Sequence, residues 1–568
     1  MNTQTQINIE NTLSKSAAKQ IILNWLEDQE LSIAPMVQKI DTYRLSSQFS
    51  ITHTSDEVAI IILRRVYEDK QKTDKREIVI AANRIGHDLD SEDAMQLGLE
   101  LLVATRNIFF QVFKQSSLTD NRKYFEIKTT LSMDSDTKHR LERLQFLPPM
   151  LTIPKERTAV SGGYLTIPTL HTLNRHSATA QPFAAINKAQ AVPFNLDLRY
   201  GTDKIDTHYA AQTYKWFESK QQFHFVYQYD FRGRLYCHGY DISHQGTEAK
   251  KAMLTFAETE LLTPEGINYL KIEIANCFGQ DKLSFLSRIK WFNAQTEFDT
   301  SKAKEPKLAE KALDAYLNRD KPTNINTYMD ATASGLQLYA ALTSCASTAS
   351  LCNLNNSNRA DVYELVADAI SSDRQAVKKP LMTYLYGKMA TTTVEEQVHE
   401  ATAKLAPSAV TAMNLIYEAH KISKQAEYNW SLPDGFKVHQ KDTKLVDKKC
   451  HIDQDVSITV SYQEKETAYV KNSRALAPNV IHSVDGYIVR RMITELPFRV
   501  TTIHDSFSCH PNNQRALKTK YTEILCDINE SNLLQSILRE ITQDPSYIFT
   551  KRNTLTNTMI KASPYSLS

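Results

Sequence analysis

Two aspartates that lie far apart in the sequence each stand at the end of an apolar segment. Asp330 ends "TYMD", and Asp505 lies within "TTIHDSF" (501–507). Because a buried carboxylate without a partner is costly, each needs a cation, a solvated turn or a metal ion. Taken alone, a helix cap is favoured for Asp330 and a hairpin-tip turn for Asp505. If the fold brings them together, a pair of Mg²⁺ ions would offset their repulsion and create a phosphoryl-transfer site.

A basic and aromatic stripe is predicted in "RQAVKKPLMTYLYGK". Four of its residues recur at steps of four: Arg374, Lys378, Met382 and Tyr386. On a helix these side chains lie on one slowly turning face about 18 Å long. Cations beside an aromatic ring suit a nucleoside triphosphate, although an ordinary solvated basic face is the alternative. Pro380 removes one helical hydrogen bond and is expected to kink the stripe.

A third constellation, "YQYDFRGRLY", places Asp230, Arg232 and Arg234 around Gly233. Two arginines that flank a glycine allow close approach to a phosphate backbone. The alternative is a turn that is held by a structural Arg–Asp pair.

The elements that must position these residues predict an α+β fold in which helices dominate. A short strand should end at Asp330, followed by a turn of small residues and a helix from about Ser334, and Asp505 should lie in a hairpin. Residues 1–145 are mainly helical by periodicity. Within them, "SEDAMQLGLELLVATRNIFFQVFKQ" carries apolar residues at helical spacing and predicts one helix, which opens with the N-terminal cap Ser91-Glu92-Asp93. The charged run between its helices is typical of a solvated face or loop.

Other segments give local predictions. "LPPMLTIPKERTAVSGGYL" (147–165) indicates a loop or linker, and "DVSITVSYQEKETAYVKN" alternates as a β-hairpin does. "EGINYLKIEIANCFG" and "HQGTEAKKAMLTFAE" both predict helices.

Composition narrows the class of protein. The chain is 42% hydrophobic and 23% charged, as in soluble globular proteins, and its net charge of +2 requires any basic surface to be local. No apolar run approaches the roughly 18 residues of a membrane span, and no signal or transit peptide is expected at the N-terminus. The seven cysteines form no C-x-x-C pair, which argues against a zinc site and favours a reducing compartment.

In combination and in this order, the motifs resemble those of the single-subunit, bacteriophage-type DNA-directed RNA polymerases of T-odd phages, mitochondria and linear plasmids. "DATASGLQ" resembles motif A of that family, "RQAVKKPLMTYLYG" motif B and "IHDSF" motif C. "DFRGRLY", "APNVIHSVDG" and "LPPMLTIPKERTAVSGGYL" resemble three further blocks. The resemblance covers residues 146–568, about three-quarters of the chain.

The resemblance implies a right-hand polymerase fold with palm and fingers and a thumb that is reduced or absent. The implied domains are a small helical N-terminal domain (1–145), a linker with a reduced thumb region (146–226), a first palm part with motif A (227–345), fingers with the motif B helix (346–430), a specificity-hairpin-like region (431–480), and a second palm part with motif C and the C-terminus (481–568).

The resemblance also implies roles for individual residues. Asp330 and Asp505 would hold two Mg²⁺ ions, with the carbonyl of Ala331 as a further ligand where the family usually has glycine. Lys378 would complete the catalytic set and assist the departing pyrophosphate. The implied substrate-binding residues are Arg374, Tyr386, His482, Gly387 and Met382, of which Tyr386 and His482 would recognise the ribose 2′-OH. The implied nucleic-acid-binding residues are Arg232, Arg234, Tyr236 and Lys379.

The implied function is template-directed RNA synthesis, with a DNA template, nascent RNA and ribonucleoside triphosphates as partners. The RNA 3′-OH would attack the α-phosphorus in line, assisted by one metal ion, while the other stabilises the pyrophosphate. Ser334-Gly335-Leu336-Gln337, Met382 and Ser506 favour RNA over DNA synthesis, since related DNA polymerases usually carry Glu, Phe and Glu in those regions. A family A-like DNA polymerase or primase, or a non-catalytic DNA-binding subunit, are the alternatives.

Departures from the family carry a further expectation. The interval from Tyr164 to Asp230 and the N-terminal region are both short, as in the compact polymerases of N-four-like phages. We therefore expect weak processivity or poor promoter opening without an accessory protein, no membrane association, and a site of action in the cytoplasm of an infected bacterial host. "FKVHQKDTKLVDKKCHIDQDVSITVSYQEKETAYVKN" (436–472) lies in the specificity-hairpin region of the family. Its lysines suit contact with phosphates, and its alternating strands suit a ribbon in the major groove. The alternative is a surface hairpin that reads no sequence.

Overall fold

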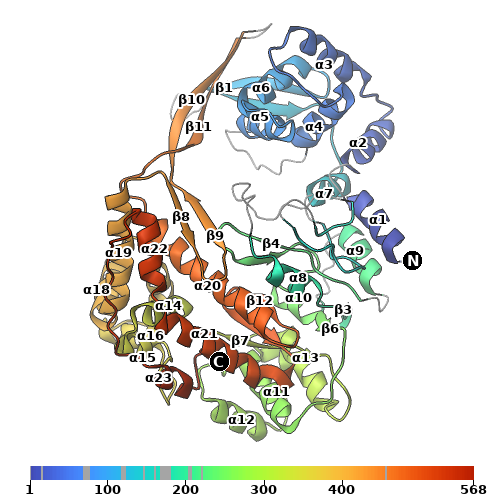
Figure 1. Ribbon diagram of the computed structural model, residues 1–568. Helices are drawn as coiled ribbons and strands as arrows, with labels where there is room; N and C mark the ends of the chain where they lie inside the picture. The colour runs from blue at the N-terminus through green and yellow to red at the C-terminus, as the bar shows by residue number, and fades with distance from the viewer. Residues whose placement is uncertain are drawn as a thin grey trace.

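The structure is a computed structural model, and it describes residues 2–13, 17–67, 77–116, 123–144, 147–158, 162–166, 181–201, 208–218, 222–453 and 457–568. A smaller N-terminal lobe lies above a larger lobe, and a long hairpin, β10–β11, reaches from the larger lobe to the smaller one (Figure 1). Helices dominate the described residues and no sheet there exceeds three strands, which confirms a helix-rich α+β fold. No described helix combines the length and the apolar character that crossing a membrane requires.

The N-terminal lobe is a helical layer with one short hairpin. Asp93 caps α6 by accepting a hydrogen bond from the Gln96 N–H, as the sequence predicts. That helix ends at Thr105, and the aromatic segment from Phe110 forms a strand, so the continued helix expected there is wrong. The charged run at 68–76 lies outside the described residues. The elements are α2 (Ala18–Glu27), α3 (Ala34–Ser46), α4 (Ser55–Tyr67), α5 (Glu77–Asp88), α6 (Ala94–Thr105), β1 (Phe110–Ser116), β2 (Lys123–Thr129) and α7 (Ser135–Arg143).

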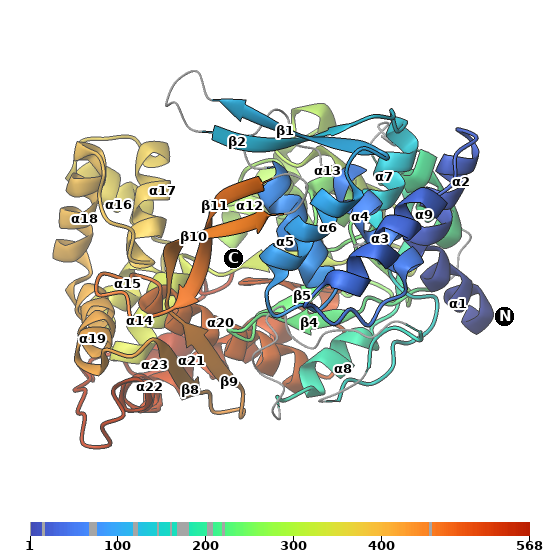
Figure 2. The same cartoon turned by 90° about the horizontal axis from the view of Figure 1, so that it is seen from above.

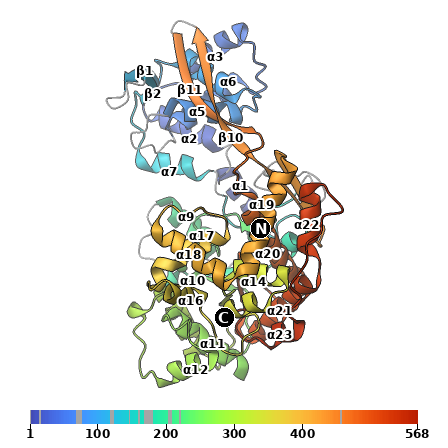
Figure 3. The same cartoon turned by 90° about the vertical axis from the view of Figure 1, so that its left-hand side faces the viewer.

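The hairpin β10–β11 joins the two lobes. Its strands, Thr443–Asp453 and Ser457–Thr467, pair antiparallel, so the alternating segment seen in the sequence is the second strand of a longer hairpin. Its outer part lies against α6 in all three views (Figures 1, 2 and 3). Four of its side chains belong to the apolar core of the N-terminal lobe: Cys450, Ile452, Ile458 and Val460.

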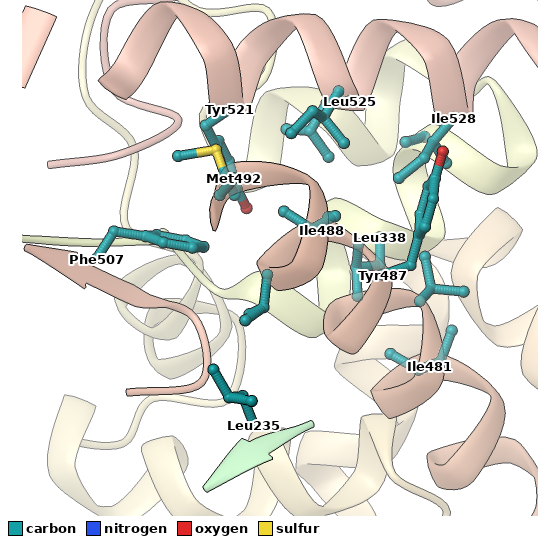
Figure 4. Close-up of a cluster of buried hydrophobic side chains, with 14 of the residues drawn as sticks. Leu235, Leu338, Ile481, Tyr487, Ile488, Met492, Phe507, Tyr521, Leu525 and Ile528 are labelled. Atoms are coloured by element: carbon teal, nitrogen blue, oxygen red, sulfur yellow. The ribbon is translucent and has the colours of Figure 1, made fainter. Parts of the chain in front are cut away.

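The core of the larger lobe holds a small sheet in place. The three-stranded sheet β12–β13–β7 comprises Thr501–Ile503, Ser506–Cys509 and Thr327–Asp330. Helices α14 (Ser334–Thr343), α20 (Leu476–Glu495) and α21 (Gln514–Glu530) pack beside it. Figure 4 shows Phe507 of the sheet facing a cluster that includes Met492 of α20 and Tyr521 of α21. The close packing of these side chains holds the sheet in a fixed position against the helices.

The remaining elements surround this core. The loop predicted at 147–165 has only isolated bridges in its described part, and the helix predicted at "EGINYLKIEIANCFG" is α11. The helix predicted at "HQGTEAKKAMLTFAE" is largely wrong, because it stops at Ala252 and Leu254–Phe256 pairs with β3. The elements before α14 are α1 (Asn2–Leu13), α8 (Ala184–Gln190), β3 (Phe194–Leu196), α9 (His208–Glu218), β4 (Tyr227–Tyr229), β5 (Leu235–Cys237), α10 (Glu248–Ala252), β6 (Leu254–Phe256), α11 (Pro264–Cys277), α12 (Phe285–Ala294) and α13 (Pro306–Leu317). Those after it are α15 (Ala346–Leu351), α16 (Val362–Ala369), α17 (Arg374–Leu385), α18 (Thr393–Leu405), α19 (Pro407–Ser423), β8 (Glu427–Ser431), β9 (Lys437–Lys441), α22 (Leu533–Thr542) and α23 (Asn557–Ala562).

Candidate active site

The central sheet brings the two predicted aspartates together. Strand β13 pairs antiparallel with β7, and Ser506 stands opposite Asp330 in the register. The Ala331 N–H donates a hydrogen bond of 3.1 Å to the backbone carbonyl of Asp505. Asp330 ends its strand and Asp505 lies in the β12–β13 turn, so both strand-end predictions are confirmed. Their backbones are therefore neighbours although 175 positions separate them in the chain.

The turn that carries Asp505 is conformationally unusual. His504 has φ of 57°, a left-handed conformation that costs a non-glycine residue about 1–2 kcal/mol. The His504 ring packs edge-on against Tyr236, with centroids 5.3 Å apart, and its Nδ1 is buried without a hydrogen-bond partner. Strain of this kind is found where the surrounding structure fixes a functional geometry.

The two carboxylates suit a divalent metal ion. Desolvation raises the pKa of Asp330, a hydrogen bond from Ser506 lowers it, and the charge of Asp505 raises it. A cation between the carboxylates would relieve that repulsion. Among the described residues, no group of three or more His, Cys, Asp or Glu side chains is arranged for a metal. Two carboxylates are nevertheless sufficient for Mg²⁺, which commonly takes its remaining oxygen ligands from water and substrate phosphates.

The predicted stripe faces the same space as the aspartates. Helix α17 begins after Asp373, whose side chain accepts hydrogen bonds from the N–H groups of the first turn, and it continues through Pro380. The cavity at the end of the sheet has a volume of about 550 Å³. It is lined by both aspartates and by Ala331, Arg374, Lys378, Met382 and Tyr386.

Tyr386 stands where the helix meets the sheet. Its ring lies 4.7 Å, centroid to centroid, from that of His482 on α20. A Cβ atom added to Gly335 would lie 3.3 Å from the Tyr386 hydroxyl oxygen, so the absence of a side chain at Gly335 leaves this hydroxyl room. Gly387 has φ of 83°, and a Cβ there would lie 1.6 Å from the Tyr417 hydroxyl oxygen. Gly387 is therefore required for the turn that places Tyr386.

His482 is held neutral in a defined tautomer. Burial, followed by the charges of Arg234 and Arg232, lowers the pKa of His482 to about 2. Arg232 Nη1 lies 2.9 Å from His482 Nδ1. Since a guanidinium can only donate, Nδ1 accepts and the ring proton resides on Nε2. His482 does not line the cavity, but its ring contacts that of Tyr386.

The arginine-rich turn contains the structural pairing that the sequence left open. Arg232 pairs with Asp230 at 2.7 Å, and the same carboxylate accepts hydrogen bonds from the backbone N–H groups of Arg232 and Arg234. Arg234 pairs with the buried Asp485 of α20 at 3.0 Å, and its side chain is 14% exposed. Gly233 has φ of 85°, and Gly486 lies against its carbonyl. The turn is thus bound to α20 through charge and close backbone contact.

Some cavity residues were not predicted, and six predicted residues do not line the cavity: Arg232, Arg234, Tyr236, Lys379, Gly387 and His482. Lys379 is exposed on α17 and Tyr236 packs on His504; neither lines the cavity. The following charged residues line the cavity but were not predicted from the sequence: Lys251, Glu273, Asp281, Lys282, Lys304, Glu305, Arg359 and Asp361. Most lie in loops or at helix ends, where no periodic pattern marks a shared face.

Comparisons with known proteins find similar sequences. A sequence model of the family described as DNA-dependent RNA polymerase matches residues 260–428 and 401–564, together more than half of the chain. "DNA-directed RNA polymerase 2B, chloroplastic/mitochondrial" of Nicotiana tabacum is 25% identical over 424 residues, which cover 58% of this chain and 40% of that protein.

Two further relatives are similar. The mitochondrial DNA-directed RNA polymerase of Schizosaccharomyces pombe is 26% identical over 405 residues, which cover 56% of this chain and 35% of that protein. The DNA-directed RNA polymerase of Pseudomonas phage phiKMV is 25% identical over 343 residues, which cover 46% and 42%. The chain spans about two fifths of the length of these curated relatives.

The Arg234–Asp485 pair gives a prediction about stability. Burial raises the pKa of Asp485 to about 6, while Arg234 opposes that rise. Arg234→Met should therefore destabilise the protein by about 3–5 kcal/mol at neutral pH, because it leaves a buried carboxylate unpaired. The pKa of Asp485 then rises further above its unfolded value, so the deficit should shrink at pH 5 and grow at pH 8. Urea unfolding at both pH values measures it.

The matched control is Arg199→Met. Arg199 pairs with Asp197 at 2.6 Å, but its side chain is 72% exposed, so the loss should be at most about 1 kcal/mol. Equal, pH-independent losses in the two variants would show that Arg234 does not hold Asp485.

Proposed function

The chain belongs to the DNA-dependent RNA polymerase family, and on that premise we propose that it adds ribonucleoside monophosphates to an RNA 3′-OH on a DNA template. The observation that carries this proposal is the β7–β13 pairing. It sets Asp330 beside Asp505 at the end of a cavity whose wall is the basic and aromatic stripe of α17. Carboxylates, cations and aromatic rings in a single recess are what nucleotidyl transfer needs.

We propose that Asp330 and Asp505, with the backbone carbonyl of Ala331, hold two Mg²⁺ ions. When bound, such ions supply acidity to the attacking hydroxyl and charge stabilisation to the leaving pyrophosphate. Two cations of the chain, Arg374 and Lys378, act on the phosphates of the substrate. Arg374 is oriented by its ion pair of 2.8 Å with Asp361 and binds phosphate oxygens with its remaining N–H groups. Lys378 is exposed to the cavity, where it neutralises and protonates the leaving group.

The same geometry supports a choice of ribose over deoxyribose. In the proposal, the Tyr386 hydroxyl meets the substrate's 2′-OH and Gly335 leaves that position open, while His482, which does not line the cavity, positions the Tyr386 ring. Burial raises the pKa of Tyr386 to about 12, so the hydroxyl keeps its proton and can donate. Met382 and Gly387 shape the adjoining wall and turn. A DNA polymerase would need this space closed, which favours RNA synthesis.

We assign the domains by the same reasoning. The palm would comprise 227–345 and 481–568, the fingers 346–430, and the specificity hairpin 431–480, with 146–226 as a linker and reduced thumb. Residues 1–145 would form a small N-terminal domain. Nucleic acid would pass by Tyr236 and Lys379, while Arg232 and Arg234 support the site through their ion pairs. The proposed site of action is the cytoplasm of an infected bacterial host, supported by the phage relative.

Asp505→Asn tests the core of the proposal. The substitution keeps the size of the side chain but removes its charge, so extension of a short RNA on a DNA scaffold with Mg²⁺ and rNTPs should fall by about 10³-fold or more. Scaffold binding should stay within about twofold. Asp320→Asn, an exposed residue outside the cavity, is the control. Retained synthesis in the Asp505 variant would refute the metal assignment.

Tyr386→Phe tests sugar selection. Loss of one hydrogen bond, about 0.5–1.5 kcal/mol, should lower the preference for rNTP over dNTP by about 3- to 10-fold. Single-nucleotide extension with each substrate measures the ratio of kcat/KM values. Tyr384→Phe is the matched control, because the Tyr384 ring stacks on His399 and does not line the cavity. An unchanged ratio in Tyr386→Phe would contradict the assignment.

We further propose that an accessory protein opens DNA for this chain, because its interval from Tyr164 to Asp230 is short. The purified chain should transcribe a template with a pre-melted bubble but give few full-length products from the same DNA as a linear duplex. Equal yields of full-length RNA from the two templates would exclude the need for a partner.

A further inference from the structure

Three cations converge on one part of the cavity wall. Lys282 comes from the loop between α11 and α12, Arg359 from the loop before α16, and Arg374 from the first turn of α17. Their mutual proximity is electrostatically unfavourable. Burial lowers the pKa of Lys282 and of Arg359. Asp281 opposes this at both residues, and Asp361 opposes it at Arg359. The charges of Arg359 and Arg374 lower the pKa of Lys282 further, and Arg374 lowers that of Arg359. Three separate chain segments therefore place like charges together around a space that is large enough for a ligand.

Two of these cations form a direct ion pair with a carboxylate, whereas Arg359 is attracted by Asp281 and Asp361 only at longer range. Lys282 pairs with Asp281 at 2.7 Å and Arg374 with Asp361 at 2.8 Å. No carboxylate of the described residues lies within 4.0 Å of Arg359. Among the described residues, Arg359 donates one long hydrogen bond of 3.4 Å from Nη2 to Ser568 Oγ, and its Nε is buried without a hydrogen-bond partner. A buried donor without a partner is costly unless a ligand satisfies it.

We propose that Arg359 binds the terminal phosphates of the incoming nucleoside triphosphate, and the pyrophosphate that leaves. A guanidinium presents parallel N–H donors that match two phosphate oxygens, and a polyphosphate would both satisfy Arg359 and neutralise the cation cluster. This inference rests on the proposed function, because it assigns Arg359 to the substrate of that site. It makes Arg359 a substrate-binding residue that belongs to neither α17 nor the aspartate turn.

The test measures anion binding apart from synthesis. The probe is inorganic tripolyphosphate, titrated by calorimetry into the full chain and three variants: Arg359→Gln, Arg359→Lys and Arg515→Ala. Arg359→Gln should weaken binding by about 10- to 100-fold, as expected for a charge-assisted hydrogen bond, and Arg359→Lys should recover part of it. Arg515 is 75% exposed on α21 and outside the cavity, so its variant should bind as the parent does.

Kinetics separate a binding role from a structural one. In RNA extension, Arg359→Gln should raise the KM for rNTP by a similar factor and change kcat less, with an unaltered melting temperature. Binding of tripolyphosphate that is unchanged in Arg359→Gln, or absent in the parent chain, would overturn the inference. Arg359-dependent binding in a chain that extends no RNA would instead overturn the proposed function and leave the phosphate site standing.

Discussion

The site depends on one pairing of strands that the rest of the chain must enforce against electrostatic repulsion. When β13 pairs with β7, the carboxylates of Asp330 and Asp505 approach each other, and His504 must adopt a left-handed conformation. Neither feature stabilises the fold. The apolar cluster behind the sheet supplies the opposing free energy, because Phe507 is 1% exposed and packs among α20 and α21. The packed core thus keeps the two carboxylates close together, although their repulsion alone would move them apart.

A second layer of charge fixes the helix behind the site. Arg234 joins the β4–β5 turn to Asp485 of α20, and Arg232 bridges the same turn to His482 one helical turn earlier. Arg490 of α20 also donates to the carbonyl of Gly233. Because three contacts bind one turn to one helix, the His482 ring has little freedom to move away from Tyr386. The arginines therefore act on the candidate site through the positions of other residues.

The sequence predicted those parts of the site that local patterns encode. The strand that ends at Asp330, the hairpin around Asp505 and the helix that carries Lys378 each follow from periodicity and turn chemistry, and the structure has all three. The helix predicted through Phe110 failed because aromatic residues at a helix end also suit a strand, and only tertiary pairing decides. Arg359 could not be predicted, since its position depends on how a loop without periodicity folds against α17.

The hairpin β10–β11 connects the larger lobe, which contains the candidate site, to the N-terminal lobe. Its base follows β8 and β9 in the larger lobe, whereas Ile452, Ile458 and Val460 are buried in the core of the smaller one. Exposing each of these side chains costs about 1.5–3 kcal/mol. Cys450 Sγ also donates to Gln96 Oε1 at 2.7 Å, so the contact is polar as well as apolar. The hairpin therefore links the two lobes. A movement of the small lobe must either carry the hairpin with it or separate the packed interface between the hairpin and that lobe.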